Sequence, residues 1–431
     1  MNACHTQPLF VPLKNVAMLH FPPFQFFLRP YLCLLCALSL PLGMIAAEID
    51  WDKARALNQR SQRGEQLSAD EQRYLEEAKA ARRAGQNAGP ASSDIDMARA
   101  RELFARSQRG ESLTAEEQAY LDKAKASRAR DNAANTSAPP PRSETGLIPL
   151  TDLTTTYQDH DGGLYGGGRN EPPEPLAKAA KAVTAKIQPL DSEGKPAAGG
   201  RIVLLSVGMS NTTQEFSRFI QLAQADPDKS PTLVLVDGAQ GGQTAARIAD
   251  ESVPFWSIID QRLKAAGVTP QQVQVIWLKE ANAGPKAGFP AETQKLQADI
   301  AADILIARKR YENLQLVYLS SRIYAGYATT PLNPEPYAYE GAFAVRGVIQ
   351  DQLKPGSNST AAELKPPLLL WGPYLWADGL KGRQAGDLVW KREDFGGDGT
   401  HPSETGREKV ARQLLKFFKE DPNTRTWFVR H

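Results

Sequence analysis

The sequence predicts an α/β protein, with a three-layer, doubly wound, flavodoxin-like domain on a parallel five-stranded sheet, preceded by a small all-α repeat region. The sheet is predicted by five short, continuously apolar runs that alternate with segments of helical periodicity, because strands buried on both faces have this pattern. The repeat region is predicted by an internal repetition near the N-terminus. With 431 residues and 41% hydrophobic content, the chain has room for one or two domains and a sizeable core.

Residues 1–47 have the features of an export signal. Lys14 and Arg29 precede an apolar run over 31–47 that ends in two alanines. The run is short for a membrane span, so we expect no stable span after signal removal and a periplasmic or extracellular location. Met18 is an alternative start, and a retained signal anchor is the alternative interpretation.

Cysteine usage and charge exclude several classes of function. All three cysteines lie within the first 36 residues, so the rest of the chain has no disulfide, thiolate metal site or cysteine nucleophile. The formal charge of +2 gives no reason to expect a nucleic-acid partner.

Residues 48–131 contain two copies of a helical hairpin, in which Ser61 to Leu67 recurs 46 positions later as Ser107 to Leu113. In each copy a glycine ends the first helix, and a hydroxyl residue followed three positions later by glutamate predicts a capping box. These residues are Gly64, Ser68 and Glu71 in the first copy and Gly110, Thr114 and Glu117 in the second. Because the apolar positions are few, the hairpins are either solvated spacers or a docking module for a protein partner. Residues 132–145, rich in Ala, Ser, Thr and Pro, are expected to be a linker to the main domain, 146–431.

The main domain alternates strands and helices in chain order. Strands are expected at 202–207, 232–236, 273–278, 314–320 and 368–371, and helices at 175–187, 216–223, 245–250, 255–266, 292–311, 343–353 and from 407 onward. The glycine-rich stretch 159–170 predicts neither helix nor strand but a loop that forms a rim over the domain. Its His160, flanked by two aspartates, is expected to be a solvated surface histidine rather than a ligand.

Polar residues follow these strands, where ligands bind in parallel sheets. The last strand leads to Asp398 and His401, three positions apart on a turn that Pro402 is expected to stiffen as the first residue of a helix. A carboxylate beside an imidazole can fix its tautomer, which makes His401 a candidate general base. Ser210, after the first strand, is its candidate nucleophile, with a glycine amide and the Asn282 side chain available to a developing oxyanion.

This set resembles the SGNH (GDSL-type) hydrolase family over the chain from about residue 200 to the C-terminus. The four blocks match Gly208-Met209-Ser210, 239–244, Glu280-Ala281-Asn282 and 398–402. The resemblance implies Ser210 as nucleophile, Asp398 and His401 as its partners, and an oxyanion hole from the Ser210 amide, Gly242 and Asn282, with Gly241 as the alternative glycine. Two departures are Met209, where the family usually has aspartate, and a third block without the Gly-x-Asn-Asp pattern.

The family implies an exported serine esterase, a carboxylic ester hydrolase without metal or cofactor, cleaving an ester (acetyl by preference) on a carbohydrate such as an acylated glycan. Candidate substrate contacts are Asn211, Tyr324, Tyr374 and Trp376, the aromatic ones as a rim for sugar rings; packing over the end of the sheet is their alternative role. Two other functions fit the sequence: a catalytically inactive SGNH-fold protein that binds carbohydrate, and an interaction protein that acts through its hairpins.

Overall fold

The computed structural model describes residues 53, 57, 60, 67–87, 96–108, 113–134, 141–354 and 367–430. The chain divides into two compact units, 1–92 and 93–431, which we describe separately. The predicted signal, 1–47, lies outside the described residues. Within the ranges above, no helix combines the length and apolarity that crossing a bilayer requires.

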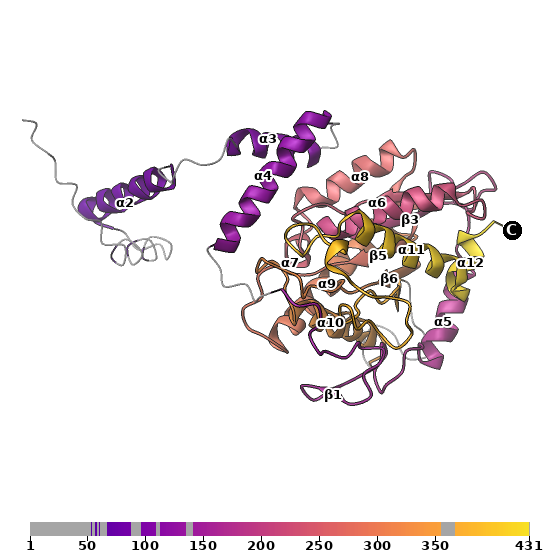
Figure 1. Cartoon of the computed structure of the whole chain (residues 1–431). Helices are drawn as coiled ribbons and strands as arrows, with labels where there is room; N and C mark the ends of the chain where they lie inside the picture. The colour runs from indigo at the N-terminus through magenta and orange to yellow at the C-terminus, as the bar shows by residue number, and fades with distance from the viewer. Residues whose placement is uncertain are drawn as a thin grey trace, which may run out of the picture. The chain divides into compact units, whose positions relative to one another are not determined.

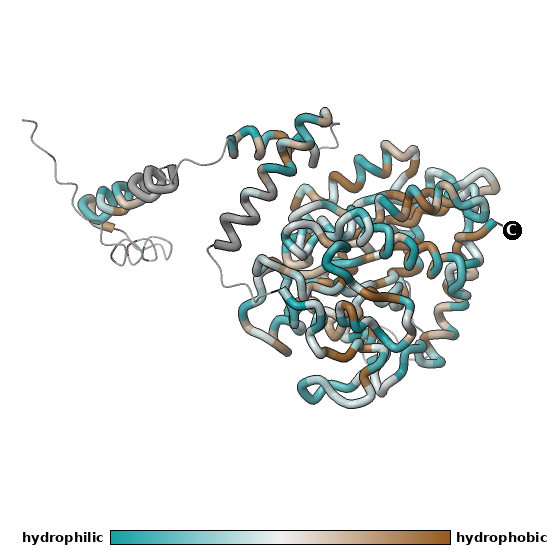
Figure 2. The backbone as a smooth tube through the Cα atoms, viewed as in Figure 1, coloured by the Kyte–Doolittle hydropathy of each residue, from teal (hydrophilic) through white to brown (hydrophobic). Residues whose placement is uncertain are grey.

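The first hairpin is stabilised by the capping box that its sequence predicts. Before α2 (Ala69–Asn87), the Ser68 N–H donates to Glu71 Oε2 at 2.9 Å, and the Glu71 N–H donates to Ser68 Oγ at 3.2 Å. Arg60 Nη1 also donates to Glu71, at 2.7 Å. Few apolar side chains are buried, and Figure 2 shows α2 as mostly hydrophilic along its described length.

The second hairpin repeats these contacts 46 positions later in α3 (Met97–Gln108) and α4 (Ala115–Ala134). Thr114 and Glu117 exchange the same two capping bonds, at 2.9 and 3.2 Å, and Arg106 Nη1 donates to Glu117 at 2.6 Å. Both predicted capping boxes are therefore confirmed.

The predicted parallel five-stranded sheet is confirmed, in the order β4-β3-β5-β6-β7. Figure 1 labels three of its strands, β3, β5 and β6. Its strands are β3 (Ile202–Gly208), β4 (Leu233–Asp237), β5 (Val273–Lys279), β6 (Leu316–Leu319) and β7 (Leu368–Trp371). All four pairings are parallel, and β3, β5, β6 and β7 are buried along their whole length. Continuous apolar runs therefore located the strands to within about two residues, because both faces of the sheet are covered.

Helices cover the sheet on two faces. The connection from β3 to β4 runs in the opposite direction across the sheet from that between β4 and β5, so right-handed crossovers place their helices on opposite faces. On one face α6 (Ser210–Ala225) packs on α11 (Glu404–Glu420), which contacts α12 (Pro422–Phe428), which in turn contacts α5 (Glu174–Thr184). The other connections contribute α7 (Ala245–Ile248), α8 (Pro254–Ala265), the 3-10 turn η1 (Pro270–Gln272), α9 (Ala291–Arg310) and α10 (Tyr337–Asp351).

Three details differ from the sequence prediction. Two residues of the glycine-rich stretch do form a strand, since β2 (His160–Asp161) pairs with β1 (Thr156–Tyr157). The helix expected from 343 begins at Tyr337, and the helix expected from 216 begins at Ser210.

The expected linker ends earlier than residue 145, because residues 142–145 are bound to the α/β domain. The Arg142 N–H donates to Gly326 O, and Thr145 donates to Asp378 Oδ1 at 2.7 Å through both its N–H and its hydroxyl. Asp378 is fully buried, so these bonds satisfy a carboxylate that water does not reach.

A buried ion pair joins the sheet to the helix that follows Ser210. Lys279 ends β5, and its Nζ donates to Glu215 of α6 at 2.5 and 2.7 Å, with both side chains fully buried. Removing one partner from such a pair leaves an uncompensated charge in the interior.

We therefore predict that Lys279→Met lowers the free energy of unfolding by about 3–5 kcal/mol. Urea unfolding of the full chain measures it. The double variant Lys279→Met/Glu215→Leu should recover most of the loss, because neither charge then remains buried. Lys195→Ala removes a comparable but exposed pair with Glu193 and is the control, with an expected cost below about 1 kcal/mol. A single variant no less stable than this control would contradict the prediction.

Candidate active site

The turn at 396–402 has a backbone that only glycine permits at its centre. Gly399 has φ +64°, and a Cβ there would lie 1.8 Å from the carbonyl oxygen of Tyr327. Its N–H donates to Gly396 O, and the Gly396 N–H donates to His401 O. Pro402 precedes rather than begins the next helix: Ser403 is the N-cap of α11 and accepts a hydrogen bond from the Gly406 N–H. The turn is thus fixed on both sides of His401.

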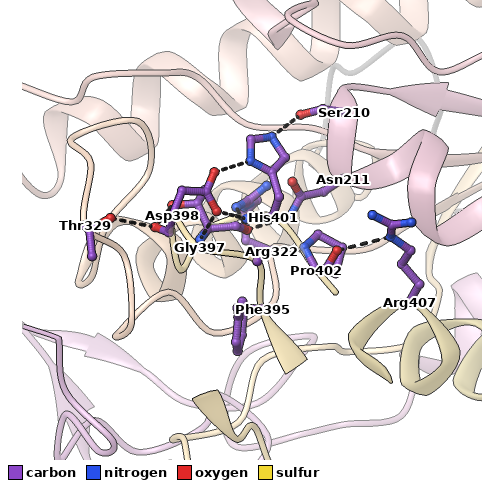
Figure 3. Close-up of polar contacts among 12 residues, drawn as sticks. Ser210, Asn211, Arg322, Thr329, Phe395, Gly397, Asp398, His401, Pro402 and Arg407 are labelled. Carbon is purple, nitrogen blue, oxygen red and sulfur yellow. Dashed lines mark hydrogen bonds and ion pairs between the residues drawn. The ribbon is translucent and has the colours of Figure 1, made fainter. Parts of the chain in front are cut away.

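Asp398 holds His401 in one orientation (Figure 3). Its Oδ1 accepts from the backbone N–H groups of Thr400 and His401, each at 3.0 Å, and its Oδ2 lies 2.5 Å from His401 Nδ1. Burial raises the pKa of Asp398, but the hydrogen bonds and charge of His401 outweigh burial and lower this pKa to about 2. An ionised Asp398 makes Nδ1 the protonated nitrogen, which leaves His401 Nε2 as an acceptor.

Ser210 lies at that acceptor. It is the first residue of α6, directly after β3, and its Oγ is 2.8 Å from His401 Nε2. The structure thus brings Ser210, His401 and Asp398 into one hydrogen-bonded chain, while their catalytic roles stay a prediction. The Ser210 N–H belongs to the first turn of α6, whose N–H groups have no acceptor within the helix and favour negative charge nearby.

Asn282 makes its side-chain hydrogen bonds to residues outside this chain of bonds. Its Oδ1 accepts from the Ala246 N–H at 2.9 Å, and its Nδ2 donates to Asp299 Oδ2 at 2.6 Å. Among the described residues, none of its side-chain bonds reaches Ser210, His401 or Asp398. The expected oxyanion role of Asn282 therefore gains no support from the hydrogen bonds.

Gly242 is exposed and lies on the loop between β4 and α7, whose first residues, 238–240, are buried. It has φ +75°, and a Cβ there would meet no atom within 4 Å. The loop is bonded to β3, the strand before Ser210, because the Gln240 N–H donates to Gly208 O. Gly242, not Gly241, is the position whose backbone favours glycine.

The candidate substrate contacts are buried, so the structure gives no support to their expected role, which stays a prediction. Asn211 is 1% exposed and donates to Thr400 O. The hydroxyls of Tyr324 and Tyr374 bind the backbone of Arg142 and Leu150, and Trp376 Nε1 donates to Glu335. The burial of the three aromatic residues fits their alternative role, which is to pack over the end of the sheet.

Two residues that the sequence analysis missed support the turn. Thr329 donates to Asp398 O through its N–H at 3.0 Å and its hydroxyl at 3.2 Å. Arg322, fully buried after β6, points Nη2 at Thr400 O at 3.5 Å. No motif marks either residue, and only the position after a strand end could have drawn attention to Arg322.

A hollow of about 190 Å³ lies elsewhere, between β2, α9 and α10, and its lining includes His160, Phe289, Phe343 and Arg346 but none of the three bonded residues. His160 is half-buried and packs edge-on against Phe289. In the part of the chain that the structure describes, no three His, Cys, Asp or Glu side chains are grouped to hold a metal ion.

No protein-family model and no curated protein sequence matches this chain. Similar solved structures include an acetyl esterase, 13% identical over 49% of this chain and 94% of its own, with a TM-score of 0.31. A family 3 carbohydrate esterase from Talaromyces cellulolyticus is 14% identical over 49% of this chain and 94% of its own, with a TM-score of 0.30. A salicylyl-acyltransferase from a tetracycline biosynthetic pathway is 16% identical over 53% of this chain and 58% of its own, again with a TM-score of 0.30. Similarities this distant carry no argument about function, which has to come from the site itself.

The lowered pKa of Asp398 predicts an acid-dependent contribution to stability. Its folded pKa of about 2 lies below the unfolded value of about 3.9, so the contribution is complete above pH 3.9 and is lost as the pH falls toward 2. Between pH 5 and 2 the wild type should lose on the order of 2 kcal/mol more unfolding free energy than Asp398→Asn. Denaturant titrations at a series of pH values measure how the unfolding free energy of each protein depends on pH. The same dependence in both proteins would contradict the lowered pKa of Asp398.

Proposed function

We propose that this protein is a serine-dependent carboxylic ester hydrolase that works through an acyl-enzyme. The observation that carries the proposal is the continuous chain from Ser210 Oγ to His401 Nε2 at 2.8 Å and from His401 Nδ1 to Asp398 Oδ2 at 2.5 Å. A serine hydroxyl is activated when a base lies within hydrogen-bond reach of it and a third group orients that base.

In the acylation step His401 Nε2 removes the hydroxyl proton as Ser210 Oγ bonds to the ester carbonyl carbon, and the carbonyl electron pair moves to oxygen. Asp398, held ionised, stabilises the imidazolium that forms. Collapse of the tetrahedral oxyanion breaks the bond to the alcohol, whose oxygen takes the proton from His401. Water then attacks the acyl-serine in the same manner, releasing a carboxylic acid and restoring the Ser210 hydroxyl.

The oxyanion donors in this proposal are the Ser210 N–H, at the N-terminal end of α6, and an N–H of the Gly241-Gly242 turn. Backbone donors that are already in place need no rearrangement when charge develops. Asn282 is the third candidate; one of its two Nδ2 protons is bonded to Asp299, so only the other is free for a substrate oxygen.

We further propose that the natural substrate is an acyl ester, acetyl by preference, on an extracellular carbohydrate. The support is the order of the chain: an export-type N-terminus and hydrophilic hairpins precede the α/β domain, as suits a secreted enzyme acting on a polymer. The aromatic residues expected to form a sugar-binding rim give no support, because they are buried.

A catalytically inactive protein that binds a ligand beside Ser210 and His401 is the second candidate. The observation that favours it is that the Asn282 side chain is already bonded to Ala246 and Asp299, which leaves it a single N–H for a substrate oxygen. It predicts ligand binding without turnover and no covalent labelling of Ser210.

We predict that the wild type hydrolyses p-nitrophenyl acetate. Ser210→Ala and His401→Ala should each lower kcat by about 10⁴-fold or more, because removing one member of a nucleophile–base pair abolishes the contribution of the other. His160→Ala, which changes a histidine outside the bonded chain, is the matched control and should keep wild-type activity. Circular dichroism verifies that each variant is folded.

A fluorophosphonate should also modify Ser210 in the wild type, as intact-protein mass spectrometry would show. A folded wild type that neither hydrolyses the ester nor takes up the label would contradict the esterase proposal and favour the binding protein.

A further inference from the structure

We propose that Asn211 is a positioning residue that sets the distance between the nucleophile and its base. The inference rests on the proposed function and adds to it a group that touches neither substrate nor reacting atoms. Asn211 follows Ser210 directly in the first turn of α6, and its Nδ2 donates to Thr400 O at 3.1 Å. Thr400 directly precedes His401. The Asn211 carboxamide thus joins the residue after Ser210 to the residue before His401.

The other supports of the turn come from a different part of the fold. Thr329 and Arg322 follow β6, so their bonds to Asp398 O and Thr400 O fix the turn relative to that strand. Apart from the Ser210–His401 bond itself, the Asn211 bond is the one hydrogen bond, among the described residues, between the first turn of α6 and residues 398–401. It therefore fixes the turn relative to the nucleophile.

The environment makes this bond hard to replace. Asn211 is 1% exposed, and Thr400 is equally buried, so water cannot substitute for the lost donor. The Oδ1 of Asn211 is buried without a partner, which is the cost of directing Nδ2 at the carbonyl. Arg322, whose Nη2 is 3.5 Å from the same oxygen, is a second and longer contact.

A shift of the turn would act on the first chemical step. Proton transfer requires Ser210 Oγ and His401 Nε2 within about 2.6–3.2 Å, and a misplacement of about 1 Å costs on the order of 100-fold in rate. Substrate binding does not depend on this distance. Loss of the Asn211 bond should therefore lower kcat and leave KM unchanged.

The test measures the rate of Ser210 modification by a fluorophosphonate in the full chain. We expect Asn211→Ala to lower the second-order rate constant and kcat by about 10- to 100-fold, with KM unchanged within about twofold. In a His401→Ala background the same substitution should have no further effect, because Asn211 acts through His401. Asn313→Ala is the matched control: its Nδ2 also donates to a backbone carbonyl, that of Gln271, far along the chain from the site, so it should keep the labelling rate.

Three results overturn the inference. Labelling of Asn211→Ala within about twofold of wild type would show that the bond is dispensable. An equal fall in the wild-type and His401→Ala backgrounds would show a general loss of structure instead of positioning. If Asn211→Ala does not fold, Asn211→Leu, which removes the donor but fills the space, is judged by the same two criteria.

The labelling of the wild type separates this inference from the proposed function. An unlabelled wild type overturns the proposed function, and this inference with it. A labelled wild type with an unaffected Asn211→Ala overturns this inference alone.

Discussion

The hydrogen bond between Ser210 and His401 joins positions 191 residues apart, and the sheet determines how the chain closes that distance. Ser210 follows β3, in the interior of the sheet, whereas His401 follows β7, at its edge. With strands about 4.8 Å apart, the chain after β7 has to return about 14 Å across the ends of β6 and β5. Residues 372–398 make this return, and the rest of the site depends on how firmly they are held.

A return segment of this length needs a core of its own. Trp376 and Trp390 are fully buried within it, and their indole N–H groups donate to Glu335 and Leu375 O. Phe395 packs against Trp390 and against Tyr327, which lies after β6. Aromatic residues after a strand end suggested a binding rim, but here they pack the segment that brings His401 back to Ser210.

Much of the architecture could be predicted because it depends on local patterns. Continuous apolar runs gave the five strands, and hydroxyl–glutamate spacing gave both capping boxes, since each is decided by neighbours in sequence. The Asp398–His401 turn belongs to the same class, because Asp398 binds groups only two and three residues away. The roles of Asn211 and Asn282 could not be predicted, because their partners Thr400 and Asp299 lie 189 and 17 positions away and no local pattern links them.

The repeated contacts of the two helical hairpins bear on how their number could change in evolution. Arg60–Glu71 recurs as Arg106–Glu117, and Lys53 over Tyr74 recurs as Arg99 over Tyr120. Each of these contacts is made within a single repeat copy, so a duplicated gene segment would carry both partners of each of these contacts. Gain or loss of one copy by recombination would leave these particular contacts of the other copy intact.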